Sequence, residues 1–149
     1  MQLPLRPPIR VSFPFGEKPD FDPAYYAQFG YPGHNGVDLS ARMHTPVFAP
    51  HSGRLTVGDQ GGKGYGLFIW IEGEKYLSVL GHLLAICVLW DESPDVIEGQ
   101  FIARSGNSGM STAPHLHWGL RVHGVSNPAY KDWVDPLAYL PNRGAQAGG

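Results

Sequence analysis

The stretch "STAPHLHWGL", residues 111–120, places two histidines one residue apart in an otherwise apolar run. In a β-strand, residues i and i+2 point to the same side, and their Cα atoms lie roughly 6.5 to 7 Å apart. His115 and His117 would therefore share one face of a strand, while Leu116 points into the core. Two imidazoles so placed can engage one metal ion and its bound water, although a pair of ordinary surface or hydrogen-bonded core histidines would give the same pattern.

A second cluster, "GHNGVD" at residues 33–38, sets His34 and Asp38 four residues apart. Four residues of extended strand cover about 13 Å, too far for two ligands that each lie ~2 Å from one metal ion. Pro32, Gly33 and Gly36 make a poor helix start, so the sequence predicts a bend at the glycines. His34, Asp38 and an imidazole from a distant strand would leave the fourth zinc position open, which is typical of catalytic sites.

Most of the chain after residue 45 reads as short strands separated by glycine and proline. "EGEK", residues 72–75, is expected to close a hairpin. We therefore predict an all-β, mainly antiparallel fold, a small two-sheet or barrel-sandwich domain. Its zinc cleft would be walled by the loops at 16–33 and 58–66. The strand candidates are "TPVFAP", "GRLTVG", "GLFIWIE", "KYLSVLG", "AICVLW", "QFIAR" and "HLHWGLRV".

The composition fits one domain of 149 residues, with 42% hydrophobic residues. A net charge of -2 provides no cationic field, so no nucleic-acid partner is expected. No apolar run approaches the ~18 residues of a membrane span, and no export signal is visible. Cys87, the single cysteine, is expected to be a small core residue. We expect an extended lead at 1–11, the domain itself at 12–141 and a disordered tail at 142–149.

The motifs "HNGVD", "GHL" and "STAPHLHW", in this order and spacing, resemble those of the lysostaphin-like (LytM-type) zinc metallopeptidases, which are peptidoglycan endopeptidases. The resemblance covers about residues 12–140. It implies that His34, Asp38 and His117 bind one Zn²⁺ ion per chain and that His82 and His115 form the catalytic pair, with the division of roles between the two left open. The family often uses an upstream tyrosine as well, for which Tyr31 and Tyr26 are the candidates.

The implied activity is zinc-dependent hydrolysis of cross-bridges or stem peptides of bacterial peptidoglycan. No "HExxH" helix supplies a glutamate base, so a histidine must move the proton. Such an enzyme would act on the cell wall, in the periplasm or outside the cell. Since no export signal is visible, we expect delivery by a phage, export by another route, or an excised domain. The expected state is a monomer or a part of a phage assembly.

The aromatic side chains expected to line the substrate groove are Tyr31, Tyr65 and Trp118, with plain packing as the alternative for each. His44, His51 and His123 fall at turn positions and are expected to face solvent. Two other functions stay open: a catalytically silent zinc-bearing binding or phage structural module, and a related zinc amidase or carboxypeptidase. All five key residues are present, which favours the enzyme. The amidases usually have an "ExxH"-type segment, which "APHLHW" lacks.

Overall fold

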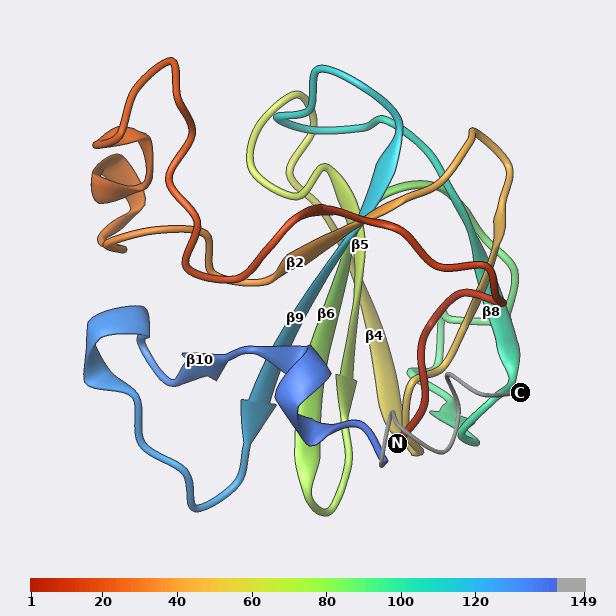
Figure 1. Ribbon diagram of the computed structural model, residues 1–149. Coiled ribbons are helices and arrows are strands. Elements are labelled where there is room, and N and C mark those ends of the chain that lie inside the picture. The colour runs from red at the N-terminus through yellow and green to blue at the C-terminus, as the bar shows by residue number, and fades with distance from the viewer. Residues whose placement is uncertain (142–149) are drawn as a thin grey trace.

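The computed structural model describes residues 1–141, and Figure 1 shows a curved sheet with long loops around it. The predicted tail at 142–149 lies outside the described residues. The elements are β1 (Val11–Phe13), η1 (Tyr25–Phe29), β2 (Val37–Ser40), β3 (Pro46–Phe48), β4 (Gly53–Asp59), β5 (Leu67–Glu72), β6 (Tyr76–Ile86), β7 (Asp95–Val96), β8 (Phe101–Ser105), β9 (His115–Val122), η2 (Pro128–Tyr130), β10 (Trp133–Val134) and η3 (Pro136–Tyr139). The prediction of an all-β fold is confirmed.

All strand pairs are antiparallel, and the main path runs β1-β2-β9-β6-β5-β4-β7. β10 pairs with β9, while β8 pairs with β6 and carries β3 on its other edge. The hairpin predicted at 72–75 joins β5 to β6. Because β8 and β3 branch from β6, this ten-stranded sheet curves around the largest of its three apolar clusters without closing into a barrel.

This largest cluster, the main core, draws buried apolar residues from strands β2 to β9, and its largest member is Trp118, with no exposed surface. Residues 1–10 form no strand but pack onto this core through Leu5, which is 5% exposed. The amide of Phe48 donates a hydrogen bond to the Pro4 carbonyl, which fixes the lead against β3. No helix among residues 1–141 is long and apolar enough to span a membrane.

β6 is one strand of 11 residues where the sequence suggested two separate ones. Its first half pairs with β9 up to Gly81, and its second half pairs with β8 from Leu83. His82 lies between these partners as the extra residue of a bulge opposite β5, with a left-handed φ of 61°. The strand thus changes partner at His82, the residue for which the family resemblance implies a catalytic role.

The core position expected for Cys87 is wrong, because its side chain is exposed. β6 ends at Ile86, one residue earlier. Cys87 keeps a backbone hydrogen bond to the Ile102 carbonyl, but its side chain lies beyond the part of β6 that faces the core.

Candidate functional site

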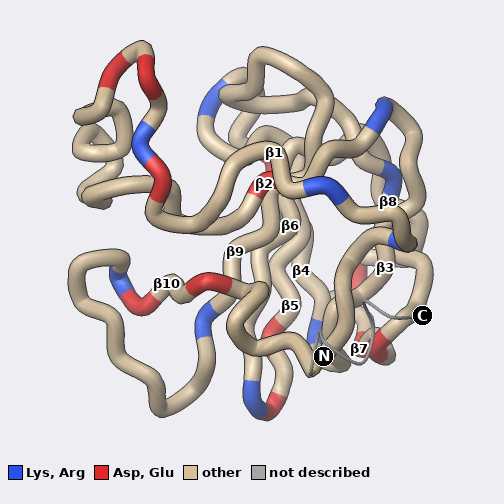
Figure 2. Tube along the Cα trace, viewed as in Figure 1, with Lys and Arg blue, Asp and Glu red and all other residues tan. Residues whose placement is uncertain are grey.

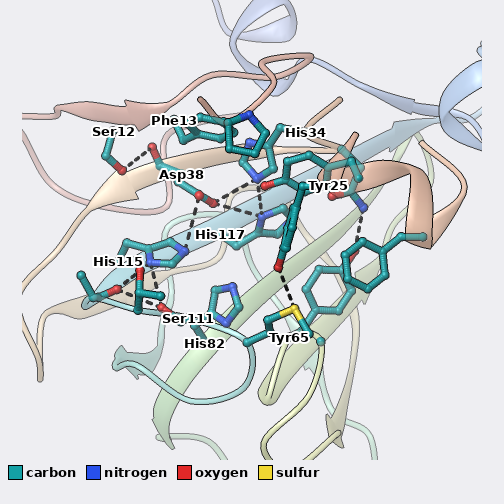
Figure 3. A pocket seen from close by; sticks show the side chains of 18 of the residues that line it. Ser12, Phe13, Tyr25, His34, Asp38, Tyr65, His82, Ser111, His115 and His117 are labelled. Atoms are coloured by element: carbon teal, nitrogen blue, oxygen red, sulfur yellow. Dashed lines mark hydrogen bonds and ion pairs between the residues drawn. The ribbon is translucent and has the colours of Figure 1, made fainter. Parts of the chain in front are cut away.

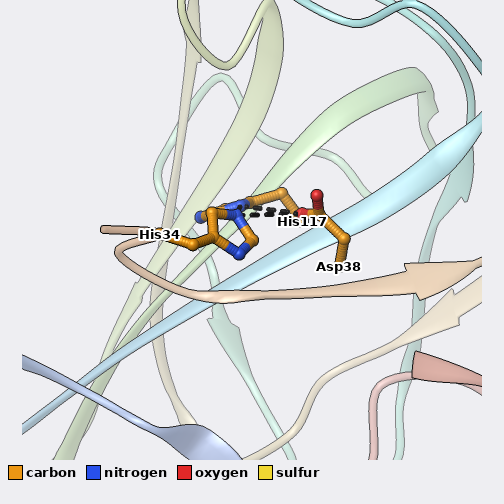
Figure 4. A group of neighbouring side chains, drawn as sticks. All are labelled: His34, Asp38 and His117. Atoms are coloured by element: carbon orange, nitrogen blue, oxygen red, sulfur yellow. Dashed lines mark hydrogen bonds and ion pairs between the residues drawn. The ribbon is translucent and has the colours of Figure 1, made fainter. Parts of the chain in front are cut away.

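Three side chains converge on one point at the edge between β2 and β9, as Figure 4 shows. Oδ1 of Asp38 lies 3.1 Å from Nδ1 of His117 and 3.3 Å from Nε2 of His34. The two imidazole nitrogens lie 3.2 Å apart. Three donor atoms therefore form a nearly equilateral triangle, built from the residues that the sequence marked as metal ligands.

The register of the sheet brings this triangle together. Asp38 on β2 is directly opposite His117 on β9, so their side chains leave neighbouring backbones on the same face. His34 precedes β2 in a bend that includes Asn35 and Gly36, as the glycines predicted. Nδ1 of His34 donates a hydrogen bond to the Pro14 carbonyl, 3.2 Å away, which leaves the lone pair of Nε2 facing the triangle.

Gly36 has a second purpose that the sequence did not reveal. A Cβ at this position would lie 2.6 Å from Cε1 of His117, 2.7 Å from its Nε2 and 2.7 Å from the Trp118 carbonyl oxygen. Glycine is therefore needed because the His117 ring occupies the space that a side chain would take. Nε2 of this ring is buried and has no hydrogen-bond partner among the described residues, so Nδ1 is the atom directed at the other two donors.

The triangle fits a divalent metal ion. Ligand atoms that lie about 2.0–2.1 Å from one tetrahedral ion are about 3.3–3.4 Å from each other, close to the observed separations. Burial opposes ionisation of Asp38, but the hydrogen bonds and charges of His117 and His34 outweigh it and hold the pKa of the carboxyl well below its ordinary value. The carboxylate is therefore charged at neutral pH, and two imidazoles with one carboxylate form a donor set typical of zinc.

His82 and His115 lie beside the triangle, with ring centroids 4.6 Å apart (Figure 3). Nδ1 of His82 donates to the Ser108 carbonyl at 2.7 Å, and Nδ1 of His115 donates to the Ala113 carbonyl at 2.8 Å. In both rings Nε2 is therefore the nitrogen that is not bound to a backbone carbonyl. The Nε2 atom of His115 lies 3.5 Å from Oδ2 of Asp38. Burial, followed by the charges of His117 and His115, lowers the pKa of His82 to about 4, so this ring is neutral at pH 7.

These five residues lie along a cleft of about 820 Å³. Its walls include residues of the loops at 16–33 and 58–66, as expected, and of residues 110–114. The hydroxyl of Tyr25 lies 2.7 Å from Sδ of Met110, a contact that joins the first wall to the last (Figure 3). The cleft is large enough for a short peptide segment.

The three expected groove aromatics have different positions. Tyr65 and Tyr31 line the cleft, and the Tyr65 hydroxyl accepts a hydrogen bond from Nδ2 of Asn35 at 3.1 Å. Trp118 does not line the cleft, and this expectation is wrong. It is fully buried on the opposite face of β9 from His117, where its Nε1 donates to the Ser78 hydroxyl at 3.2 Å.

Two tyrosine rings lie against the donor triangle: the ring centroid of Tyr65 lies 5.1 Å from that of His117, and the ring centroid of Tyr26 lies 5.3 Å from that of His34. Burial and the charge of Asp38 raise the pKa of Tyr26, so its hydroxyl keeps its proton at neutral pH. Tyr31 instead stacks on Tyr130 at 6.3 Å. Consecutive tyrosines in a proline-rich loop gave no periodic signal that could have ranked Tyr26 above Tyr31.

The remaining histidines are not part of the site. His44 and His123 are exposed, as expected. His51 is buried, with 4% of its surface exposed, so its predicted solvent-facing position is wrong. Its Nδ1 donates to the Ser52 carbonyl, and its Nε2 accepts from the Ser78 hydroxyl at 2.8 Å.

Residues 32–129 match the model of the family described as Peptidase family M23. An uncharacterized metalloprotease of Haemophilus influenzae is 36% identical over 125 residues, which make up 83% of this chain and 25% of that protein. The peptidoglycan DD-endopeptidase ShyA of Vibrio cholerae is 32% identical over 111 residues, or 74% of this chain and 25% of its own length. The chain therefore spans about a quarter of either relative.

Among solved structures, the catalytic domain of the antimicrobial peptidase lysostaphin from Staphylococcus simulans superposes with a TM-score of 0.68 at 28% identity. The match covers 87% of this chain and 90% of that domain. The similarity therefore extends through the whole β-fold and is not confined to the histidine motifs.

Proposed function

Because the chain belongs to peptidase family M23, we propose that it is a zinc-dependent endopeptidase that cuts peptide bonds in bacterial peptidoglycan. One observation carries the proposal. A triangle of three metal-donor atoms and two histidines whose Nδ1 atoms are held by backbone carbonyls share one open cleft. ShyA, which is a peptidoglycan DD-endopeptidase, supports the choice of substrate. The place of action would then be the cell wall.

His34, Asp38 and His117 would hold the ion through Nε2, Oδ1 and Nδ1. Zinc, when bound, supplies Lewis-acid activation of water and of a peptide carbonyl. The hydrogen bond from His34 to Pro14 keeps the ring in the tautomer that offers Nε2. The anionic carboxylate and two neutral rings leave a net positive charge on the occupied site.

Peptide hydrolysis needs a proton taken from water and a proton given to the departing amine nitrogen as the C–N bond breaks. His82, neutral at pH 7, can accept a proton at Nε2 because its Nδ1 proton is committed to the Ser108 carbonyl. His115 offers the second Nε2 in the same cleft, fixed by the Ala113 carbonyl. The Tyr26 hydroxyl, which stays protonated on a ring beside His34 that lines the cleft, would donate a hydrogen bond to a substrate oxygen.

The decisive experiment is digestion of purified peptidoglycan by the zinc-loaded protein, with released fragments identified by mass spectrometry. We expect new peptide ends that disappear with a chelator and return with zinc. His115→Asn should abolish the release, whereas His123→Gln, at an exposed histidine outside the cleft, should not. Stoichiometric zinc binding with several wall chemotypes left intact would favour the silent binding module instead.

A further inference from the structure

The cleft has one basic end. Among the described residues that line it, Arg10 is the only lysine or arginine, and Asp38 is the only acid. The Asp38 carboxylate contacts three histidines, so the guanidinium of Arg10 is the charged group of the lining that can bind a ligand. It lines the same side as Ser12, two residues along the chain, as expected for alternate residues of an extended segment.

The side chain of Arg10 is exposed and has no structural partner in the described part of the chain. Other arginines are occupied: Arg6 stacks on Phe48 at 4.3 Å, Arg54 pairs with Asp95 at 3.7 Å, Arg104 donates to the His44 carbonyl, and Arg121 donates to the Lys131 carbonyl. Among residues 1–141, the arginines whose side chains make no hydrogen bond, ion pair or ring contact are Arg10 and Arg42. Arg42 lines a hollow that adjoins the cleft through Ser40 and Pro114.

The sheet sets the distance from Arg10 to the reaction centre. Its carbonyl accepts a hydrogen bond from the Ser40 amide, and Ser40 on β2 is directly opposite His115 on β9. Strands lie about 4.8 Å apart, so the backbone of Arg10 lies two strands, about 10 Å, from that of His115. From this position the long side chain of Arg10 can reach a substrate group that lies one or two residues from the peptide bond held beside His115.

The other end of the cleft has the opposite character. Its wall contributes the aromatic rings of Phe21, Tyr25 and Phe29. The same loop carries three exposed acids and one lysine, which are Glu17, Asp20, Asp22 and Lys18. Figure 2 shows acidic segments in this loop and basic segments beside β1 and β8. A substrate carboxylate is therefore attracted toward β1 and repelled from the opposite wall.

We propose that Arg10 binds a free carboxylate of the substrate on the His115 side of the bond that is cut. The guanidinium can hold a carboxylate with two parallel hydrogen bonds. This deepens the proposed function and rests on it, because it selects among wall peptides. Bonds to a diamino acid that keeps a free carboxylate beside the cut amide become preferred substrates, while glycyl-glycine bridges, which carry no carboxylate there, become poor ones.

The test uses two synthetic peptides with a D-Ala-to-diamino acid bond, identical except that the diamino acid carboxyl is free in one and a carboxamide in the other. Zinc-loaded wild type should cut the free acid with a kcat/KM about tenfold higher. Arg10→Gln should lower kcat/KM for the free-acid peptide alone, so that the ratio of the two kcat/KM values comes close to one. Arg10→Lys should keep part of the preference for the free acid. Arg54→Gln, at an exposed arginine outside the cleft, should leave the ratio unchanged.

An unchanged ratio in Arg10→Gln, or no discrimination by wild type, would overturn the role of Arg10. Failure of the proposed function looks different, because then neither peptide nor peptidoglycan is cut. In that case Arg10 is tested by binding of the same two peptides to wild type and Arg10→Gln. Tighter binding of the acid that disappears in the variant and weakens with salt supports the proposal, and equal affinities refute it.

Discussion

At the scale of single residues, the site separates into atoms that would hold a metal ion and atoms that would move protons. His117 belongs to the first group, since its Nδ1 lies 3.1 Å from Asp38 and 3.2 Å from His34. His117→Ala should lose zinc, with affinity reduced by more than the roughly 10–100-fold typical of changes outside the ligand set. Zinc content after dialysis, measured by mass spectrometry, checks this expectation. Retention of one zinc per chain by His117→Ala would refute the ligand assignment.

His82 belongs to the second group. His82→Asn removes the ring but suits the left-handed backbone at this position, where φ is 61°. Zinc should stay bound while turnover of peptidoglycan falls by about 10²–10⁴-fold, the usual contribution of a general acid or base. Activity and zinc content measured on the same sample separate the two groups. Loss of zinc together with activity would place His82 among the ligands.

At the scale of elements, the bend before β2 and strand β9 must approach closely, and Gly36 permits this. Gly36→Ala puts a methyl group 2.6 Å from His117 Cε1 and 2.7 Å from the Trp118 carbonyl oxygen. This oxygen is a backbone atom of β9, so it cannot move away without distorting the strand. We expect a loss of about 1–3 kcal/mol in the free energy of unfolding and weaker zinc binding, because the His117 ring must shift. Gly62→Ala, with nothing within 4 Å, is the matched control. Denaturant unfolding that gives equal stabilities for the two variants would contradict this.

The same elements show what the sequence could predict. Alternation along residues 115–118 placed both histidines on one face. The same rule puts Trp118 with Leu116 in the core, where the structure has it, so the groove position expected for Trp118 went against the alternation. The bulge at His82 was not predictable from the pattern, because one extra residue breaks the alternation and makes one strand appear as two. Motif spacing identified the histidines, while strand register, which depends on long-range pairing, decided how they meet.

At the scale of the whole molecule, burial was the property that sequence predicted least well. Turn chemistry around residue 51 suggested an exposed histidine, but the Ser78 hydroxyl links His51 to Trp118 through the core. An apolar neighbourhood suggested a buried Cys87, but β6 ends before it. In both cases burial depended on where a strand begins or ends in the sheet. Long-range strand pairing sets these ends, and the local sequence around the residue does not reveal them.

The buried His51 gives the stability of the protein a dependence on pH that is separate from the donor triangle. Burial lowers the pKa of this ring below its ordinary value of 6.5, and its neutral Nε2 accepts the Ser78 hydrogen bond. As pH falls below 6.5, His51 takes up a proton in the unfolded chain but not yet in the folded chain. The free energy of unfolding therefore falls between pH 6.5 and the lower pKa of His51 in the folded protein. A tenfold difference in proton affinity between the folded and unfolded chains corresponds to about 1.4 kcal/mol.

His51→Gln, whose side chain can still accept the hydrogen bond from Ser78 but does not titrate, should reduce this loss of stability at low pH. Urea unfolding between pH 7.5 and 5 with a chelator present measures it, and identical pH profiles for wild type and variant would show that His51 does not contribute.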